Sequence, residues 1–214
     1  GGGWDEYGIQ QWIGEAFKRD NLVWDDLPIV GVNANAGNPH YSPTPETSKP
    51  VRKGDWVLLD MWAKVNKPGA VYYDITWTGF VGDTPPEKHR ELFQIVTGAR
   101  NVGINTVKDA FAAKRKIQGW EVDEAVRAHI DKSGYGQYFV HRTGHSIGPE
   151  VHGNGANMDN LETKDEREII PNTIFSIEPG IYMPDIGVRS EIDMLIRNGA
   201  AEVTGKIQSE IVII

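Results

Sequence analysis

The stretch from Trp56 to Thr78 constrains the fold more than any other part of the chain. Two β-rich runs, Trp56–Val65 and Val71–Thr78, flank a Lys-Pro-Gly sequence at residues 67–69. Proline and glycine favour turns, and two such runs joined by a few turn-forming residues are typical of a β-hairpin. The sequence therefore predicts a hairpin with a short irregular loop.

Each strand of this predicted hairpin carries one acid among apolar neighbours. Asp60 follows a Val-Leu-Leu run, and Asp74 lies between two tyrosines and an isoleucine. A buried carboxylate without a partner is costly enough that it protonates or pairs with a cation. From this hairpin alone, a cation site and a pair of locally hydrogen-bonded acids at a sheet edge are equally good interpretations.

The second half of the chain repeats the pattern. Residues 173–196 read as a strand, a turn at 183–187 and a second strand, with Glu178 and Glu191 in the acidic positions. We infer an internal pseudo-repeat of two hairpins, each of which presents two carboxylates. Four converging carboxylates repel one another strongly unless divalent cations lie between them, so the repeat favours a metal site.

Composition narrows the chemistry and the partners. The chain has no cysteine, which excludes thiolate ligands and leaves oxygen and imidazole as metal ligands; it also fits a reducing cytoplasm, the location that we expect. A net charge of -8 argues against binding to nucleic acid. No apolar run approaches the ~18 residues that span a bilayer, so we expect no membrane partner.

The remaining elements predict an α+β domain in which helices cover a curved sheet. We expect residues 1–3 to be a linker or tag remnant and residues 4–214 to form one domain. Residues 4–19 have the periodicity of an amphipathic helix that buries Trp12 and its apolar neighbours. Further helices are expected after the proline pair at 85–86, at Val107–Lys114 and at Glu121–Lys132, the last ended by Gly134.

Half of the histidines lie in one glycine-rich segment, residues 138–154. His141, His145 and His152 alternate there with glycines, which allow close approach of the backbone to a ligand. Imidazoles are neutral metal ligands or proton carriers. A single histidine is more often structural, but three beside a four-carboxylate pattern favour chemistry. His40 stands apart on a predicted loop, and taken alone it reads as a surface or capping residue.

Together these acids and His145 resemble the metal site of the pita-bread metallopeptidases, the family of methionine aminopeptidase, Xaa-Pro aminopeptidase, prolidase and creatinase. The matching motifs occur in the family's order: LLD at 58–60, DITWT at 74–78, HRTGHSIG at 141–148, SIEPGIY at 176–182 and VRSE at 188–191. The resemblance covers nearly the whole chain. It implies an α+β pita-bread fold with a pseudo-twofold repeat and a curved antiparallel sheet covered by helices.

The resemblance also implies a set of metal ligands and a cofactor. Two divalent ions are expected, with manganese favoured and cobalt or zinc as alternatives. Asp60 would bind one ion, Asp74 and Glu191 would bridge the two, and His145 with Glu178 would complete the second.

Further roles are implied for residues near the ions. Glu178 would also carry a proton, while His40 and His152 would contact the substrate and the developing oxyanion. His141 and Arg189 would border the substrate pocket. For Arg189 a structural pairing with Glu191 or a neighbouring acid is an equal alternative.

The sequence VRSEID at 188–193 is similar to the Xaa-Pro aminopeptidase and prolidase branch, whereas methionine aminopeptidases usually lack the arginine. The resemblance thus implies an aminopeptidase that removes the residue before a proline by a hydroxide activated between two metals. The alternatives are an Xaa-Pro dipeptidase, in which Arg142 or Arg189 captures the substrate carboxylate, and a non-catalytic peptide-binding module.

Four departures from the pattern bear on substrates and partners, the first being a segment between Asp60 and Asp74 that is a few residues longer than usual. Trp77 stands where arginine is common, and Gly153 stands where glutamate often follows the histidine. This branch normally also carries an N-terminal domain ahead of the metal-binding part, which we do not expect in this chain. A peptide substrate is the expected partner, and a homodimer is a further option.

Overall fold

The first hairpin forms the centre of one sheet in the computed structural model, which describes residues 3–214. Strand β3 spans Trp56–Val65, as predicted, and pairs antiparallel with β4, Tyr73–Phe80. The second strand was predicted from Val71. It begins later because the Tyr72 N–H donates to the carbonyl of Gly148 and leaves the ladder.

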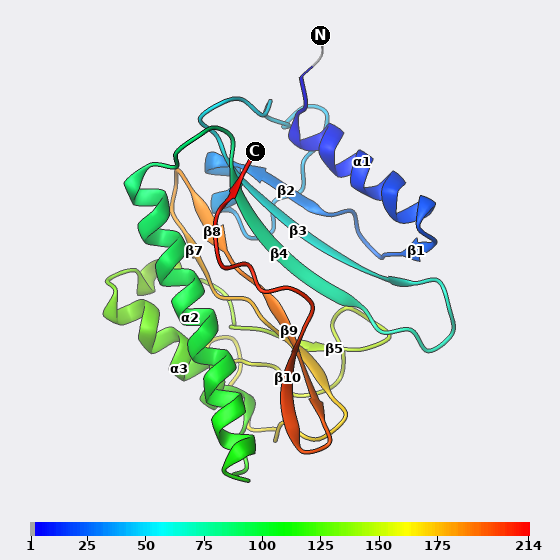
Figure 1. Ribbon diagram of the computed structural model, residues 1–214, viewed down its shortest axis with the longest axis vertical. Coiled ribbons are helices and arrows are strands. Elements are labelled where there is room, and N and C mark those ends of the chain that lie inside the picture. The colour runs from blue at the N-terminus through cyan, green and yellow to red at the C-terminus, as the bar shows by residue number, and fades with distance from the viewer. Residues whose placement is uncertain (1–2) are drawn as a thin grey trace.

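Short strands extend this sheet on both sides of the hairpin. Strands β1, Leu22–Val23, and β2, Ile29–Val32, both pair antiparallel with β3. At the other edge β11, Val212–Ile213, runs parallel to β4. The C-terminal segment, red in Figure 1, thus returns to the first hairpin after the chain has completed the second.

The second hairpin is also present, but it is interrupted. Its outer pair is β6, Ile174–Ile177, with β9, Ile192–Arg197, and its tip is β7, Gly180–Tyr182, with β8, Gly187–Arg189. Strands β5, Ser146–Ile147, and β10, Ala200–Thr204, extend the outer pair. In the described part of the chain, the predicted curved sheet therefore consists of three hydrogen-bonded sheets.

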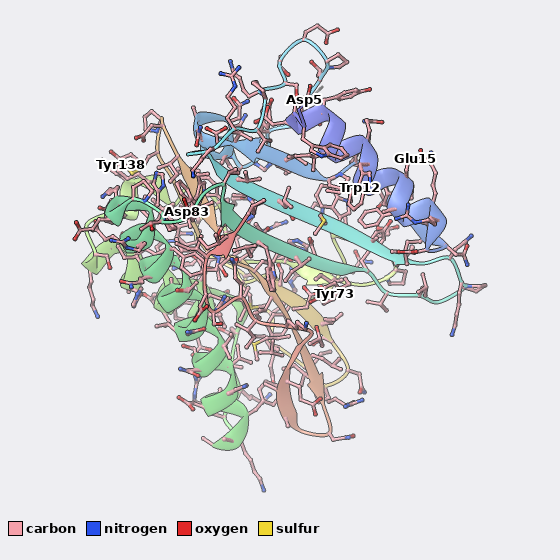
Figure 2. The ribbon with its side chains drawn as sticks, turned by 45° about the horizontal axis from the view of Figure 1, so that its top comes forward. Asp5, Trp12, Glu15, Tyr73, Asp83 and Tyr138 are labelled. Atoms are coloured by element: carbon pink, nitrogen blue, oxygen red, sulfur yellow. The ribbon has the colours of Figure 1, made fainter. Side chains whose placement is uncertain are left out.

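Helix α1, Glu6–Arg19, begins at the cap Asp5, whose side chain accepts the N–H of Gly8. Its buried face contains Glu6, Gln10 and Ile13, because hydrogen bonds satisfy the two polar side chains. The prediction that Trp12 lies in the core was wrong. Trp12, labelled on α1 in Figure 2, is 54% exposed, and its ring meets that of Trp4 edge-on.

Helix α2 spans Glu87–Ala112 without a break, so the separate helix predicted at Val107–Lys114 is its C-terminal part. Gly103 lies inside this helix because the packing leaves no room for a side chain. A Cβ there would approach Val126 to 2.9 Å and Ile177 to 3.0 Å. Glycine at this point marks close helix packing rather than the end of a helix.

Helix α3 spans Gly119–Lys132, two residues longer at its start than predicted. A capping box between Gln118 and Glu121 explains the earlier start. Gly134 follows the helix with φ +83°, as expected of a stop residue. Figure 1 shows α2 and α3 side by side against the second hairpin, with α1 beside β1 and β2 of the other sheet.

Two apolar clusters hold these layers together. One joins α2 and α3 to the first hairpin and the tip of the second, and includes Trp56, Leu92 and Val188. The other joins the two helices to the outer pair of the second hairpin, and includes Val107 and Phe175. Residues 3–214 also contain two short 3-10 helices, η1, Asn33–Gly37, and η2, Gly136–Tyr138. Within residues 3–214, no helix combines the length and the apolar character needed to cross a bilayer.

We expect Leu92→Ala to lower the free energy of unfolding by about 2–5 kcal/mol, because the substitution leaves a cavity where the packing cannot collapse. Leu92 is fully buried in the first cluster. Leu161→Ala, at a side chain that is 47% exposed, is the matched control and should change stability by less than about 0.5 kcal/mol. Urea unfolding of both variants measures the difference, and equal effects would contradict the assigned core.

Candidate metal centre

Every site residue proposed from the sequence lines one cavity of about 540 Å³. These residues come from the first hairpin, the histidine segment, the second hairpin and the loop after β2. They are His40, Asp60, Asp74, His141, His145, His152, Glu178, Arg189 and Glu191. The tertiary structure thus brings together all the side chains that the sequence pattern singled out.

The register of the first hairpin places its two acids on the same face. Asp60 lies opposite Thr76, and Asp74 is two residues from Thr76 along β4. Side chains two residues apart on a strand share a face, so both carboxylates point to the cavity beside Thr76. Asp60 is 9% and Asp74 5% exposed.

The second pair of acids lies at the interruption of the second hairpin. Pro179 has no N–H to donate, and the N–H groups of both acids leave the ladder. That of Glu178 donates to the carbonyl of Thr143 at 2.7 Å, and that of Glu191 points to the carbonyl of Thr76 at 3.4 Å. The Thr76 hydroxyl also donates to a Glu191 carboxylate oxygen at 2.7 Å. The contacts between Glu191 and Thr76, made where the second hairpin is interrupted, therefore connect the two hairpins.

The carboxylates converge in two overlapping groups. Oxygens of Asp60, Asp74 and Glu191 all lie within 4.8 Å of one another. His145 Nε2 is 3.4 Å from an oxygen of Asp74 and 3.4 Å from an oxygen of Glu178. Asp74 thus belongs to a group of three carboxylates that could hold a metal ion, and it also contacts His145.

His145 is held with one particular nitrogen toward the acids. Its Nδ1 is 3.1 Å from the carbonyl of Ser146, which can only accept a hydrogen bond, so Nδ1 carries the proton and Nε2 faces the carboxylates. The preceding Gly144 packs against the second hairpin, where a Cβ would approach the carbonyl of Ser176 to 2.0 Å. This glycine brings the histidine segment close to β6 rather than to a ligand.

Helix α3 anchors the chain just before His145. Asp123 on this helix accepts hydrogen bonds from the backbone and hydroxyl of Thr143. Arg127, paired with Asp123, donates to the carbonyls of Phe139 and His141. The segment that carries the histidines is thus fixed by a largely buried ion pair.

The electrostatics of the site show a shortage of positive charge. Burial, together with the nearby acids, raises the pKa of Asp60 to about 7 although Arg189 opposes the shift. Burial and the same acids raise the pKa of Glu191 well above its ordinary value. For His145, burial acts to lower the pKa, but the carboxylates of Asp74 and Glu178 outweigh it and raise the pKa to about 9.

This set of residues fits divalent cations. Asp60 Oδ1 is buried and has no hydrogen-bond partner among the described residues, so an oxygen is left over for a cation. Four carboxylates and one imidazole are also ligands that suit manganese, cobalt or zinc. Bound divalent charge would remove the repulsion that raises the pKa values of Asp60 and Glu191.

Arg189 lines the cavity, yet its guanidinium is engaged by the protein. It donates to Asp60, to the Thr76 hydroxyl at 2.9 Å and to the Tyr182 hydroxyl at 2.9 Å. The side chain is buried. The acid with which it pairs is Asp60 rather than Glu191.

Tyr182, which the sequence did not single out, connects Arg189 to His141. Its hydroxyl donates to His141 Nε2 at 2.7 Å, while His141 Nδ1 donates to the carbonyl of Arg142 at 2.7 Å. Burial lowers the pKa of His141 to about 4, consistent with a neutral ring that uses both nitrogens. The signal was present in the sequence, because Tyr182 is the last residue of the SIEPGIY motif that carries the resemblance.

Asp193 is a second residue that sequence reasoning missed. One of its oxygens accepts the backbone N–H of Asp74 at 3.0 Å, and the other is buried without a partner among residues 3–214. Burial raises its pKa to about 8. Its alternation with Glu191 along the chain gave the only hint that it faces the same region.

The other two histidines proposed for the site, His40 and His152, are exposed and line the cavity. The His152 ring meets the His145 ring edge-on at 4.5 Å between centroids. Burial, followed by the charges of His145 and Arg142, lowers the pKa of His152. His40 is exposed on the loop after η1, and it lines the cavity although it is far in sequence from the other histidines of the site.

Comparison with known proteins assigns this arrangement to a family. The sequence profile of metallopeptidase family M24 matches residues 2–198. The chain belongs to family M24. A putative Xaa-Pro aminopeptidase of Mycoplasma pneumoniae is 33% identical over 203 residues, which are 92% of this chain and 52% of the relative. An Xaa-Pro dipeptidase of Pyrococcus furiosus is 36% identical over 160 residues, 74% of this chain and 42% of the relative.

Solved structures of M24 enzymes have the same fold. A dipeptidase from Pyrococcus horikoshii superimposes with a TM-score of 0.83 and 31% identity over 99% of this chain and 55% of that one. An Xaa-Pro dipeptidase from Bacillus anthracis superimposes with a TM-score of 0.82 and 29% identity, over 99% of this chain and 56% of that one. The predicted α+β pita-bread fold is thereby confirmed. The chain spans about half the length of the curated relatives it matches.

The raised pKa values predict how the stability of this M24 chain depends on pH. The folded metal-free state keeps protons on Asp60 and Asp193 up to pKa values of about 7 and about 8, whereas the unfolded chain releases them near pH 4. His145, raised to about 9, acts in the same direction. Stability is therefore lost as the pH rises through this range.

We expect the thermal unfolding midpoint of the EDTA-treated protein to fall between about pH 5 and about pH 8. Saturating manganese should flatten or reverse this slope, because bound cations favour the ionised carboxylates. Scanning calorimetry with and without the metal measures both slopes. A metal-free midpoint that rises over this range would contradict the assigned electrostatics.

Proposed function

We propose that the chain is the catalytic part of a metal-dependent aminopeptidase that removes the first residue from peptides with proline in second position. The observation that carries this proposal is the convergence of four carboxylates and His145 in one cavity, with both hairpins contributing. The names of two M24 relatives, an Xaa-Pro aminopeptidase and an Xaa-Pro dipeptidase, support prolyl peptides as the substrate class.

We assign the two groups of acids to two divalent ions. Asp60 would bind one ion, His145 and Glu178 would bind the other, and Asp74 and Glu191 would bind both. The presence of Asp74 in both groups supports this division. When bound, such a pair of ions polarises a carbonyl and makes water nucleophilic at neutral pH.

The residues around the ions have separate tasks. Burial acts to raise the pKa of Glu178, but the charges of His145 and Arg189 outweigh it and keep the pKa below its usual range. Glu178 is thus ionised and can take a proton from the attacking water. The Ser176 hydroxyl donates to Glu178 at 3.0 Å and orients it. His152, which lines the cavity, would donate a hydrogen bond to the developing oxyanion.

Substrate selection follows from the chemistry of the free amino terminus and of the proline after the scissile bond. A free amino terminus can pair with the carboxylates of the site, whereas a proline nitrogen after the scissile bond has no N–H and needs no acceptor. His40 reaches the cavity from the loop after η1 and would contact the substrate. Tyr182 and Arg142 already engage both ring nitrogens of His141, so this residue would shape the pocket rather than bind the peptide directly.

A specific observation favours an Xaa-Pro dipeptidase as the second candidate. A dipeptidase needs a cation that captures the carboxylate after proline and so excludes longer chains. Arg189 donates to three protein groups, whereas the Arg142 side chain lines the cavity and makes no hydrogen bond to another described residue. Arg142 is therefore the cation available for this capture. A peptide-docking module without catalysis has less support, because it would not require buried carboxylates that lack a cation.

Removal of the shared ligand tests the metal assignment. Asp74→Ala should lose at least one equivalent of manganese, because both groups of acids contain this residue. Elemental analysis after loading with manganese and desalting measures the loss. Asp83→Ala is the matched control, because its carboxylate pairs with Lys53 on the surface. Equal metal content in both variants would overturn the assignment.

A small peptide panel separates the candidate functions. With manganese or cobalt added, an aminopeptidase should cleave Ala-Pro-Ala, whereas a dipeptidase should cleave Ala-Pro alone. In the second case Arg142→Met should raise the KM for Ala-Pro about 10–100-fold, the worth of a hydrogen bond to a charged group. Faster cleavage of Met-Ala-Ser would reject prolyl specificity. No cleavage by a folded, metal-loaded protein would favour the docking module.

A further inference from the structure

Arg100 is a buried cation that the proposed chemistry does not use. It lies on α2, is 2% exposed and makes no ion pair with a carboxylate among the described residues. Burial lowers its pKa to about 10, so it remains charged at neutral pH. A buried charge without an opposite charge is costly. The Nε and NH2 of Arg100 donate to the neighbouring Asn101 Oδ1 at 3.3 and 3.0 Å, and its hydrogen bonds to distant residues identify the groups that it serves.

The guanidinium of Arg100 reaches the backbone behind the metal centre. Its NH1 donates to the Ser190 hydroxyl at 2.5 Å and to the carbonyl of Gln208 at 2.8 Å. Ser190 is fully buried between Arg189 and Glu191. Since successive side chains of an extended chain point to opposite sides, Arg189 and Glu191 face the cavity while Ser190 faces α2.

Gln208 carries this connection to the first hairpin. Its side-chain amide donates to the carbonyl of Thr78 at 2.6 Å and accepts the Thr78 N–H at 3.0 Å, so it takes the place of a backbone partner for β4. Thr78 is two residues beyond Thr76, which contacts Glu191. Gln208 belongs to the C-terminal segment that runs back along β4 (Figure 1).

The two backbone N–H groups at this point make only long hydrogen bonds to other described residues. The N–H of Ser190 is 3.4 Å from the carbonyl of Pro179, and that of Glu191 is 3.4 Å from the carbonyl of Thr76. Both distances are long for a hydrogen bond, because the hairpin is interrupted here. The contact from Arg100 to Ser190 is much shorter and comes from a helix, which is a rigid support.

We propose that Arg100 and Gln208 form a brace behind the metal centre, which fixes Ser190 and thereby sets the positions of Glu191 and Arg189 relative to the first hairpin. Both are positioning residues, because neither touches the cavity. The brace joins α2, the C-terminal segment and the two hairpins. The C-terminal segment is thus part of what shapes the metal site, although it contributes no ligand.

The brace predicts an effect on metal binding that is separate from stability. Replacing a buried charged group by an apolar one of similar size is often neutral for stability, whereas loss of a supporting contact around a metal ligand typically weakens metal affinity 10–100-fold. We therefore expect Arg100→Met and Ser190→Ala each to weaken manganese binding by about ten-fold. The double variant should be no weaker than Arg100→Met alone, because both changes remove the same contact.

Titration calorimetry of the apo proteins with manganese chloride measures these affinities. Arg90→Met is the matched control, because Arg90 lies on the exposed start of α2 and donates only to the carbonyl of Pro85. If Arg100→Met does not fold, Ser190→Ala and Gln208→Leu carry the same test. Affinities of the folded brace variants that equal that of Arg90→Met would overturn the brace.

Hydrogen exchange of the metal-free proteins provides a readout that does not depend on the proposed function. Peptides covering residues 188–192 should exchange faster in Arg100→Met and Ser190→Ala than in the wild type and Arg90→Met. Unchanged exchange would also overturn the brace. Failure of the wild type to bind manganese would instead overturn the proposed function and leave the exchange result to decide on the brace.

Discussion

The central constraint on this structure is the repulsion among buried carboxylates that two hairpins bring into one cavity. Burial and mutual proximity raise the pKa values of Asp60 and Glu191, and one arginine and one histidine do not supply enough positive charge to reverse this. A chain would not gather these groups for stability alone, since apolar residues of similar size pack there at no such cost. The arrangement is intelligible as a site for divalent cations, in agreement with membership of family M24.

The interruption of the second hairpin makes this convergence possible. In a continuous ladder the backbone N–H groups of Glu178 and Glu191 would donate to carbonyls of the opposite strand. Here Pro179 ends the pairing, and the freed groups of Glu178 and Glu191 turn to Thr143 and Thr76. The same local defect leaves the backbone weakly restrained, which explains why a helix-borne arginine and a C-terminal glutamine are needed behind it. The interruption therefore accounts both for the positions of Glu178 and Glu191 and for the contacts that support the backbone behind them.

Arginine side chains near the cavity differ in what they are free to do. Arg189 is buried and donates to Asp60, Thr76 and Tyr182, so it orders the site from within. Arg142 lines the cavity, and its side chain makes no hydrogen bond to another described residue. The number of arginines around the cavity is thus a poor guide to what the cavity binds. An arginine whose N–H groups already donate to the protein has few left for another molecule.

The sequence by itself determined the first hairpin, the acidic repeat and the family, because strand periodicity, turn residues and spaced motifs are local properties. It also placed the helix stop at Gly134. Only the tertiary structure decided that Trp12 is exposed, that Gly103 lies within a continuous helix, and that Arg189 pairs with Asp60. Asp193, Tyr182 and the Arg100–Gln208 contact likewise escaped the sequence. Their roles rest on contacts between distant segments, and such contacts follow from packing and register rather than from local composition.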